Sequence, residues 1–342
     1  MRPSFHPRLI NDPFSDPALF IPFLFEKRAL LFDLGDVSAL SPKDLLKVTH
    51  VFVTHTHMDH FVGFDSLIRI FLGREKEIHL FGPKGFLSHV EGKLAGYTWN
   101  LVHESPTNLR LRVTELQKEK RLTKTYSCRD RFFSDKPHEV SFFSGVLLRE
   151  PSFRVEGCLL DHRTPCLGLC LVENFYVNIL KDALRKMELP VGPWITRFKR
   201  ALYEKQDLKS QFLVTWEEKG RVIREKAFIL GDLADRIGRI SPGQKIAYIT
   251  DILGSPENCE KVIHLVGGAD HLFIEAAFLD RDRETARKKY HLTAKEAGKL
   301  AKKADVKQLT LFHFSPRYNH QEAELRQEAL DAFTRKSQNA PL

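Results

Sequence analysis

The chain has 342 residues, of which 42% are hydrophobic and 28% charged, a composition typical of soluble globular proteins. No apolar run approaches the ~18 residues that a membrane-spanning helix needs, and the first residues lack the apolar core of a signal peptide, so we expect a cytoplasmic location and no membrane partner. Five cysteines form no C-x-x-C pair, and their odd number argues against a full disulfide framework. The net charge of +9 favours a polyanionic partner such as nucleic acid, although 44 acidic residues dilute the 53 basic ones and a generic soluble surface is the alternative.

The first hundred residues alternate strand-like and helix-like patterns. Two apolar runs, 20–25 and 29–32, flank a charged turn, and the second run ends in an acidic loop at residues 33–36. The other elements predicted here are a strand at 50–53, a helix at 64–73, a strand at 78–81, a turn at 82–85 and a helix at 86–97. This alternation of strands and helices is typical of an α/β fold.

The middle of the chain departs from that alternation. Residues 108–160 look β-rich and irregular, with a charged hairpin or loop at 117–121. A helix is predicted at 181–188, and it ends before the P-V-G-P sequence at 190–193. The residues that follow carry aromatic and basic side chains without a clear core periodicity, so this region is either a protruding arm or a pair of surface helices.

The last hundred residues return to strands and helices. Strands are predicted at 245–252, 271–275 and 309–312, and they lead to Asp251, Glu275 and His313. Helices are predicted at 293–304, with Thr293 as the N-cap residue, and at 320–335. Acidic or imidazole side chains therefore follow or end several predicted strands.

The strongest chemical signal is the sequence T-H-T-H-M-D-H at residues 54–60, directly after the apolar run at 50–53. Side chains alternate in an extended segment, so His55 and His57 point the same way and can chelate one ion. After a turn, Asp59 and His60 can reach a second ion or a bound water. Imidazole and carboxylate groups suit zinc, with manganese or iron as alternatives. A metal site here indicates a hydrolase that activates water; a polar loop with accidental histidines is the alternative.

This segment resembles the signature of the metallo-β-lactamase superfamily, whose members fold as an αββα sandwich of two similar halves. The resemblance implies three further ligands after strand-like runs: a histidine, an aspartate that bridges two metals, and a final histidine. His162, Asp251 and His313 occupy those places in the chain. A structural histidine and a surface aspartate are the alternatives for the first two.

Other segments narrow the resemblance to the ribonuclease Z family of tRNA 3′-processing endonucleases. The H-x-H-x-D-H pattern marks only the superfamily, whereas F-H-F-S-P-R-Y at 312–318 and the Gly-Pro sequence at 190–193 are much more specific. The matching segments, in the order of the family, are 55–60, 82–85, 161–165 with Gly168, 189–193, 290–293 and 311–318. The implied fold is a metallo-β-lactamase αββα sandwich with a protruding arm.

The resemblance also implies a role for each candidate site residue. It implies two zinc ions, one held by His55, His57 and His162, the other by Asp59, His60 and His313, with Asp251 between them. Asp59 would also orient or deprotonate the attacking water. His291 would assist the leaving 3′ oxygen, and Glu275 would orient that histidine, unless it is an ordinary carboxylate at a strand end.

The segment 174–226 resembles the flexible arm with which the family grips the elbow of tRNA. Arg197, Lys199 and Arg200 would contact phosphates there without reading sequence, and a solvated basic face is the alternative. We therefore expect one domain over residues 1–342 with a substrate-binding arm inserted at 174–226. The family forms homodimers, in which the arm of one subunit serves the site of the other.

The chain departs from the family pattern in three places. The predicted metal ligands are kept, so the pattern predicts the metal chemistry but not the exact substrate or cleavage position. The usual Gly-Asp-Thr is Thr250-Asp251-Ile252, and the usual Cys-Gly-Glu loop is replaced at residues 34–39. The Pro-x-Lys-x-Arg-Asn element that handles the tRNA 3′ end has no match in the chain.

Three functions stay open from the sequence. The first is a zinc-dependent endoribonuclease that cuts precursor tRNA on its 3′ side. The second is a phosphodiesterase or ester hydrolase of the same fold that acts on a small molecule or another RNA. The third is a non-enzymatic RNA-binding module on a degenerate hydrolase scaffold, against which the seven candidate ligands argue.

Overall fold

The computed structural model describes residues 4–218 and 222–334. The chain divides into two compact units. The larger unit holds Phe5–Leu147, Glu156–Cys170 and the chain from Lys245 on, and the smaller unit holds Leu148–Val155 and Leu171–Gln244. Among the described residues, no helix is long and apolar enough to cross a membrane.

The larger unit is built on an eight-stranded sheet whose strands follow the order of the sequence. The central strands β3 to β6 run parallel, and the strands at both edges are antiparallel. The strands are β1 (Arg8–Leu9), β2 (Leu19–Pro22), β3 (Ala29–Phe32), β4 (Val48–Phe52), β5 (Lys76–Pro83), β6 (Leu109–Leu116), β7 (Lys120–Ser127) and β8 (Glu139–Phe142).

Helices cover one face of this sheet, and the second sheet described below covers the other. Because side chains alternate along a strand, each central strand carries apolar residues on both faces. In β3, Ala29 and Leu31 pack into a buried cluster with helix residues such as Phe64. Phe32 lies on the opposite face of the strand and contacts Tyr248, with ring centroids 6.1 Å apart. The helices next to this sheet in the chain are α1 (Pro42–Leu45), α2 (Met58–Phe61), α3 (Phe64–Phe71) and α4 (Phe86–Ala95).

A second sheet has six strands in the order β18-β17-β16-β11-β10-β9, with β16, β17 and β18 parallel. Its strands are β9 (Val146–Arg149), β10 (Phe153–Asp161), β11 (Pro165–Glu173), β16 (Lys245–Ile249), β17 (His271–Glu275) and β18 (Leu309–Phe312). The helices near it are α8 (Pro256–Val266), α9 (Arg283–Lys288), α10 (Ala294–Lys303) and α11 (Glu322–Thr334).

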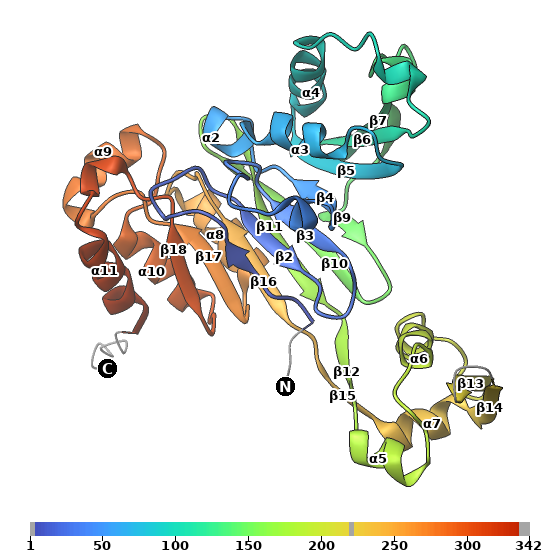
Figure 1. The fold of residues 1–342 in the computed structure, drawn as a ribbon. Helices are drawn as coiled ribbons and strands as arrows, with labels where there is room; N and C mark the ends of the chain where they lie inside the picture. Colours follow the sequence, from blue (N-terminus) through green and yellow to red (C-terminus); the bar gives the residue numbers. More distant parts are fainter. Residues whose placement is uncertain (1–3, 219–221, 335–342) are drawn as a thin grey trace, which may run out of the picture. The chain divides into compact units, whose positions relative to one another are not determined.

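The two sheets face each other and carry helices on their outer sides (Figure 1). Tyr248 of β16 contacts Phe32 of the first sheet, and the Leu167 amide of β11 donates to the Thr54 carbonyl 2.9 Å away. The second sheet is covered by α10, which begins at the predicted cap: the Thr293 side chain accepts from the Glu296 amide in a capping box. The predicted αββα sandwich is confirmed.

The predicted turn at 82–85 begins later than expected, because β5 continues through Pro83. Gly82 belongs to the strand, and a Cβ atom at this position would lie 2.3 Å from the ring of Phe86. The glycine is therefore needed for the close approach of the helix that follows, rather than for the turn itself. Only Gly85, with φ 96°, adopts a left-handed turn conformation at the start of α4.

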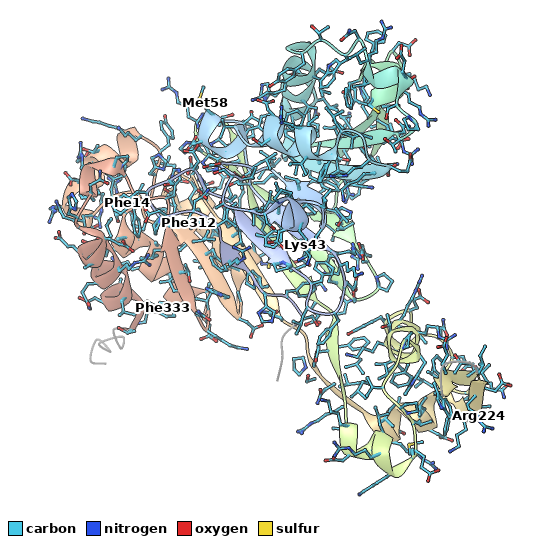
Figure 2. All side chains as sticks on the ribbon, in the orientation of Figure 1. Phe14, Lys43, Met58, Arg224, Phe312 and Phe333 are labelled. Atoms are coloured by element: carbon cyan, nitrogen blue, oxygen red, sulfur yellow. The ribbon has the colours of Figure 1, made fainter. Side chains whose placement is uncertain are left out.

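The smaller unit has a core of its own, which the sequence pattern did not reveal. Trp194 and Phe198 are fully buried, and they pack in a cluster with residues from Val177 to Ile237. Two antiparallel strand pairs and three short helices supply this cluster. The elements are β12 (Phe175–Ile179), α5 (Lys181–Lys186), α6 (Trp194–Tyr203), β13 (Gln211–Glu218), β14 (Val222–Ile229), α7 (Leu230–Ile237) and β15 (Gly238–Pro242). All side chains of the described residues are drawn in Figure 2.

Candidate metal centre

The predicted ligands lie together in the larger unit, just beyond the carboxyl ends of strands β4, β10, β16 and β18. Ligands commonly bind at this edge of α/β sheets, where loops from several strands meet. All seven predicted ligands belong to two groups of side chains whose nitrogen and oxygen atoms lie within 4.8 Å of one another. Their role as ligands stays a prediction, and the geometry shows what they can hold.

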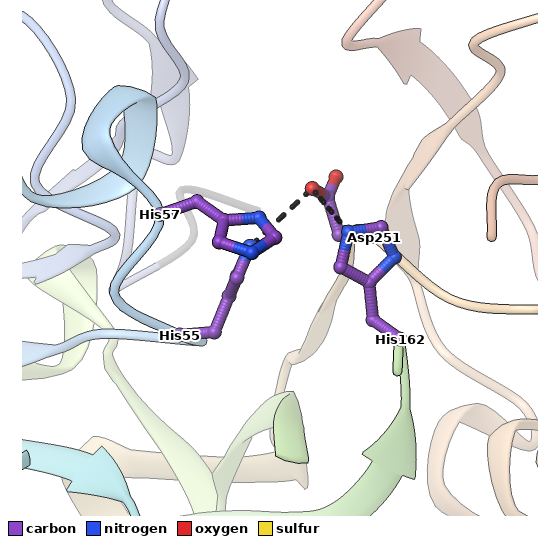
Figure 3. Close-up of side chains that lie close together, drawn as sticks. All are labelled: His55, His57, His162 and Asp251. Atoms are coloured by element: carbon purple, nitrogen blue, oxygen red, sulfur yellow. Dashed lines mark ion pairs between the residues drawn. The ribbon is translucent and has the colours of Figure 1, made fainter. Parts of the chain in front are cut away.

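The first group consists of His55, His57, His162 and Asp251 (Figure 3). The Asp251 Oδ2 atom lies 3.4 Å from the Nε2 atom of His55 and 3.4 Å from that of His162. Three of the four side chains are buried, and His57 is exposed. Three imidazoles around one carboxylate oxygen form a donor set that suits zinc.

The second group consists of Asp59, His60, His313 and again Asp251. The Asp59 Oδ2 atom lies 3.2 Å from His313 Nε2 and 3.3 Å from His60 Nε2. The other oxygen of Asp251, Oδ1, lies 3.1 Å from His313 Nδ1. The Oδ2 atom of Asp251 also lies 3.4 Å from His60 Nε2, so this carboxylate contacts histidines of both groups, as expected for a carboxylate shared by two ions.

Three imidazole nitrogens in these groups are buried and have no hydrogen-bond partner in the described parts of the chain: His55 Nε2, His60 Nε2 and His313 Nδ1. Buried polar atoms are nearly always paired, so three unpaired nitrogens facing carboxylates call for an explanation. A cation between them would accept their lone pairs and neutralise the carboxylates. The donor set therefore fits a metal ion.

The electrostatics of the cluster also fit a cation. Burial lowers the pKa of His55 to about 4, so its imidazole is neutral and available as a ligand near neutral pH. Burial opposes the charge on His60, but Asp251 and Asp33 raise its pKa well above the usual value. Burial likewise opposes the charge on Asp251, yet His313 and His60 hold its pKa well below the usual value. The carboxylates thus attract positive charge into a buried site.

The chain leaves its strands abruptly at this site. Asp251 has φ 50° and His313 φ 59°, so both adopt the left-handed conformation directly after a strand. Asp33 after β3, with φ 60°, and Arg163 after β10, with φ 61°, do the same. Such residues cost about 1–3 kcal/mol each and collect at functional sites, where the surrounding structure imposes them.

His291 and Glu275 lie beside the two groups and contact each other. The His291 Nδ1 atom is 2.8 Å from Glu275 Oε2, and the other oxygen of Glu275 accepts the Ile252 amide at 2.8 Å. Burial disfavours the imidazolium, but the Glu275 carboxylate raises the pKa of His291 to about 9. The pair also forms a third possible donor group with Asp251 and His313, so its geometry alone permits either proton transfer or metal binding.

Asp33 is a residue of the site to which the sequence assigned no role. Its Oδ2 atom lies 2.8 Å from His60 Nδ1 and accepts the Tyr248 hydroxyl at 2.9 Å, and its Oδ1 accepts the Thr54 amide at 2.7 Å. A carboxylate on the second nitrogen of a metal-binding histidine fixes the tautomer and orientation of the ring. The acidic loop at a strand end, recognised in the sequence, was the signal that could have identified it.

Unpaired basic side chains line a cavity of about 590 Å³ over the cluster. Arg163, Lys288 and Lys289 reach its wall together with His57 and His291. Within residues 4–218 and 222–334, no ion pair engages these three cations. Their charge is thus available to an anionic ligand in the cavity.

The predicted RNA-binding residues lie on α6 of the smaller unit. Arg200 is paired with Glu204 at 2.7 Å, and Lys199 is half-buried over the ring of Tyr176 at 5.2 Å. Burial lowers the pKa of Lys199. Arg197 is exposed and donates to the Thr215 hydroxyl. It has no acidic partner in the described chain. Their contact with RNA stays a prediction.

Comparison with known proteins assigns a family to this chain. The family described as "Beta-lactamase superfamily domain" matches residues 12–136 and 235–314, more than half of the chain. A protein of Latilactobacillus sakei named "Ribonuclease Z" is 31% identical over 314 residues, covering 89% of this chain and 82% of that protein. A protein of the same name from Deinococcus radiodurans is 28% identical and covers 91% of this chain and 90% of its own length.

A crystal structure of the short form of human tRNase Z is 19% identical, covers 88% of this chain and 86% of that one, and has a TM-score of 0.47. The assignment depends on the sequence relatives, which extend over nearly the whole length of both chains. The chain belongs to the ribonuclease Z family of the β-lactamase superfamily and is a metal-dependent hydrolase of the nuclease type.

Proposed function

We propose that the chain is a zinc-dependent endoribonuclease that cuts precursor tRNA on its 3′ side. The observation that carries this proposal is the pair of donor groups joined by Asp251, with His291 beside them, in a chain whose relatives are named ribonuclease Z. The homodimer and the cytoplasmic location stay predictions.

Two zinc ions are proposed as the cofactors. His55, His57 and His162 would hold one ion, and Asp59, His60 and His313 the other, with Asp251 shared by both. When bound, such ions lower the pKa of a water molecule and stabilise negative charge on a phosphoryl oxygen.

Asp59 and His291 are the proposed proton-transfer groups. The His60 and His313 imidazoles outweigh the effect of burial and lower the pKa of Asp59, so this carboxylate stays ionised and can accept a hydrogen bond from the attacking water. Glu275 holds His291 through Nδ1, which leaves Nε2 to donate a proton to the leaving 3′ oxygen. Without this proton the 3′ oxygen would leave as an alkoxide, which is far more basic than the alcohol, and cleavage would be slower.

The basic residues around the larger cavity support a polyanionic substrate. Arg163 faces the cavity from the loop after β10, Lys288 and Lys289 face it from the end of α9, and no carboxylate of the described chain neutralises them. Phosphates on either side of the scissile bond would meet these cations, which is a contact that positions the backbone without reading its sequence.

The test is cleavage of an end-labelled precursor tRNA with a 3′ trailer by the zinc-loaded protein, beside an Asp59→Ala variant. A single cut near the discriminator nucleotide, made by the wild type alone, supports the proposal. Circular dichroism of the variant must match the wild type, so that the loss is chemical rather than structural. Turnover by Asp59→Ala equal to the wild type would sink the assignment of this residue.

A second candidate is a phosphodiesterase of the same fold that acts on a smaller ester or another RNA. The lack of the Pro-x-Lys-x-Arg-Asn element in the sequence favours it. It predicts hydrolysis of bis-p-nitrophenyl phosphate by a preparation that leaves precursor tRNA intact and does not shift it in a binding assay.

A further inference from the structure

Two cavities meet at the metal centre, and their walls differ. Both are lined by Asp59, Lys289, His291 and His313. The larger one, about 590 Å³, adds the basic residues Arg163 and Lys288. The smaller one has a volume of about 290 Å³, near the lower limit of small-molecule pockets, so it can take one ring system rather than a stem of paired bases.

Apart from the four shared residues, most of the residues that line the smaller cavity are aromatic or apolar, and Asp16 adds a charge to them. Its lining beyond the shared residues is Phe14, Ser15, Asp16, Ala277, Phe278, Phe314, Ser315 and Pro316. Phe14 is half-buried and contacts the buried Phe314 edge to face, with ring centroids 5.3 Å apart (Phe14 is labelled in Figure 2). The smaller cavity therefore has a partly exposed aromatic wall next to the metal centre.

The loop that carries Phe14 is held in place by several hydrogen bonds. The Phe14 amide donates to Asp12 Oδ1 at 3.0 Å, and the Phe314 amide donates to the Pro13 carbonyl at 2.8 Å. The Asn11 side chain donates to the Asp16 and Asp36 carbonyls at 2.6 and 2.7 Å. Because this loop is already ordered, it loses little conformational entropy when a ligand binds to it.

The chemistry of the smaller cavity fits a nucleobase better than a phosphate. The Asp16 carboxylate on its wall would repel a phosphate but can accept a hydrogen bond from an exocyclic amine or a ring N–H. The ring of Phe14 can pack against a base, and such contacts are tolerant of sequence because every base has a π-face. Lys289 lies where the two cavities join, at the place suited to a phosphate between them.

We propose that the smaller cavity binds the base of an unpaired nucleotide next to the scissile phosphate, with Phe14 as its packing surface and Lys289 as the contact to the phosphate. This inference rests on the proposed function, since it takes RNA as the substrate. It assigns to residues 11–17 a role in holding the substrate end, in a chain without the family's Pro-x-Lys-x-Arg-Asn element.

The test compares Phe14→Ala and Phe14→Leu with the wild type on three precursor tRNAs: one unmodified, one abasic at the discriminator and one abasic at the first trailer nucleotide. Phe14→Leu keeps the apolar contact with Phe314 but removes the ring face. On the unmodified substrate we expect both variants to lose about tenfold in kcat/KM, the size of one base–aromatic contact. On the substrate whose missing base belongs in the cavity, the variants and the wild type become equal.

Two controls separate base binding from general damage. Phe133→Ala removes an exposed phenylalanine that does not line this cavity and leaves all three rates unchanged. Lys289→Gln lowers the rate on all three substrates by a similar factor, because a phosphate contact does not depend on the base. An equal loss by the Phe14 variants on all three substrates overturns the proposal.

A binding measurement keeps this inference distinct from the tRNA assignment. Isothermal titration of adenosine 5′-monophosphate and of ribose 5-phosphate, with the zinc-loaded wild type and Phe14→Leu, tests the cavity without any cleavage. Tighter binding of the nucleotide than of the sugar phosphate, lost in Phe14→Leu, supports the base site even if precursor tRNA is not cut. Equal binding of both compounds by the wild type contradicts it.

Discussion

In the larger unit the groups around Asp251 form a largely buried cluster and face one another, whereas in the smaller unit Arg197 and Arg200 of α6 are exposed. At the metal centre, three buried imidazole nitrogens have no hydrogen-bond partner among the described residues, so the arrangement is complete only with a cation. On α6, Arg200 is satisfied by Glu204. A buried charged group without a partner can be stabilised only by particular residues at particular positions. An exposed charged group is solvated by water, so many arrangements of its neighbours are equally stable. The first kind therefore leaves a sharp pattern in a sequence, and the second leaves only an excess of basic residues.

The largest effect is expected at His291, a half-buried residue of the larger unit that is not one of the predicted ligands. His291→Asn removes the proposed proton donor and should lower kcat by about 10²–10⁴. The bound zinc, measured by elemental analysis, should stay at the level of the wild type. His264→Asn, on the exposed side of α8, is the matched control and should change neither quantity. Loss of zinc from His291→Asn would identify this residue as a ligand instead.

A smaller effect is expected at Asp33, which acts through His60. Asp33→Asn keeps the size of the side chain but weakens the hydrogen bond to His60 Nδ1, and the metal affinity should fall about 10–100-fold. Competition with a fluorescent zinc chelator measures the affinity. Asp36 lies three residues away in the same loop, and in the described chain its side chain bonds only to Ser38, so Asp36→Asn should bind zinc like the wild type. An unchanged affinity in Asp33→Asn would show that burial alone positions His60.

The exposed charges of the smaller unit should give a modest effect that depends on salt. Replacing Arg197, Lys199 and Arg200 with alanine should weaken tRNA binding and flatten its dependence on salt by about 0.9 in log–log slope for each phosphate that is no longer neutralised. Because Arg200 is already paired, Arg197→Ala alone should account for most of the change. Arg185→Ala on α5, where Asp182 pairs with the arginine, is the control. A triple variant with an unaltered slope would mean that α6 does not bind phosphates.

The smallest effect concerns His50, a buried histidine of β4 that belongs to none of the donor groups found among the described residues. Burial, with His79 and Arg28 adding positive charge, lowers its pKa from 6.5 to about 3. Its contribution to stability is therefore complete above pH 6.5 and is lost as the pH falls toward 3. From pH 6.5 to pH 5 this loss amounts to about 2 kcal/mol.

The variant His50→Gln should lose correspondingly less stability than the wild type over the same range of pH. Urea unfolding at pH 7 and pH 5 measures the difference, with His264→Gln as the exposed control. Parallel losses in the wild type and in His50→Gln would show that this imidazole does not set the acid sensitivity. Such a result would assign that sensitivity to other groups, such as His271, whose pKa burial lowers to about 4, or the metal-centre histidines.

The sequence predicted the strands that deliver the ligands because an apolar run followed by a polar donor is a local pattern. The runs before His55, Asp251 and His313 became β4, β16 and β18, nearly at the expected residues. The grouping of the ligands came from the resemblance to the superfamily, and the structure brings the members of each group within 4.8 Å of one another, while their role as ligands stays a prediction.

Features that depend on contacts between distant segments could not be predicted. The bond between Tyr248 and Asp33 joins residues 215 positions apart, and nothing near either residue indicates it. The same holds for Phe14 and Phe314, which meet only because the N-terminal loop bonds to the chain after β18.

The buried cluster of the smaller unit was missed for a different reason. In α6 the buried residues Trp194, Phe198, Ala201 and Leu202 do follow a helical spacing, but basic residues stand between them and the region was interpreted as a charged surface.

The Asp251 carboxylate contacts histidines of both groups, and this sharing makes occupancy of the two positions interdependent. An ion on one side withdraws charge from the carboxylate and so alters the affinity for the other, and the coupling must be equal in both directions. Zinc loading and chelator stripping should consequently not follow the curve of two independent sites. If each ion strengthens the binding of the other, both positions fill over a narrow range of zinc concentration. If each ion weakens the binding of the other, the second position fills only at a higher zinc concentration.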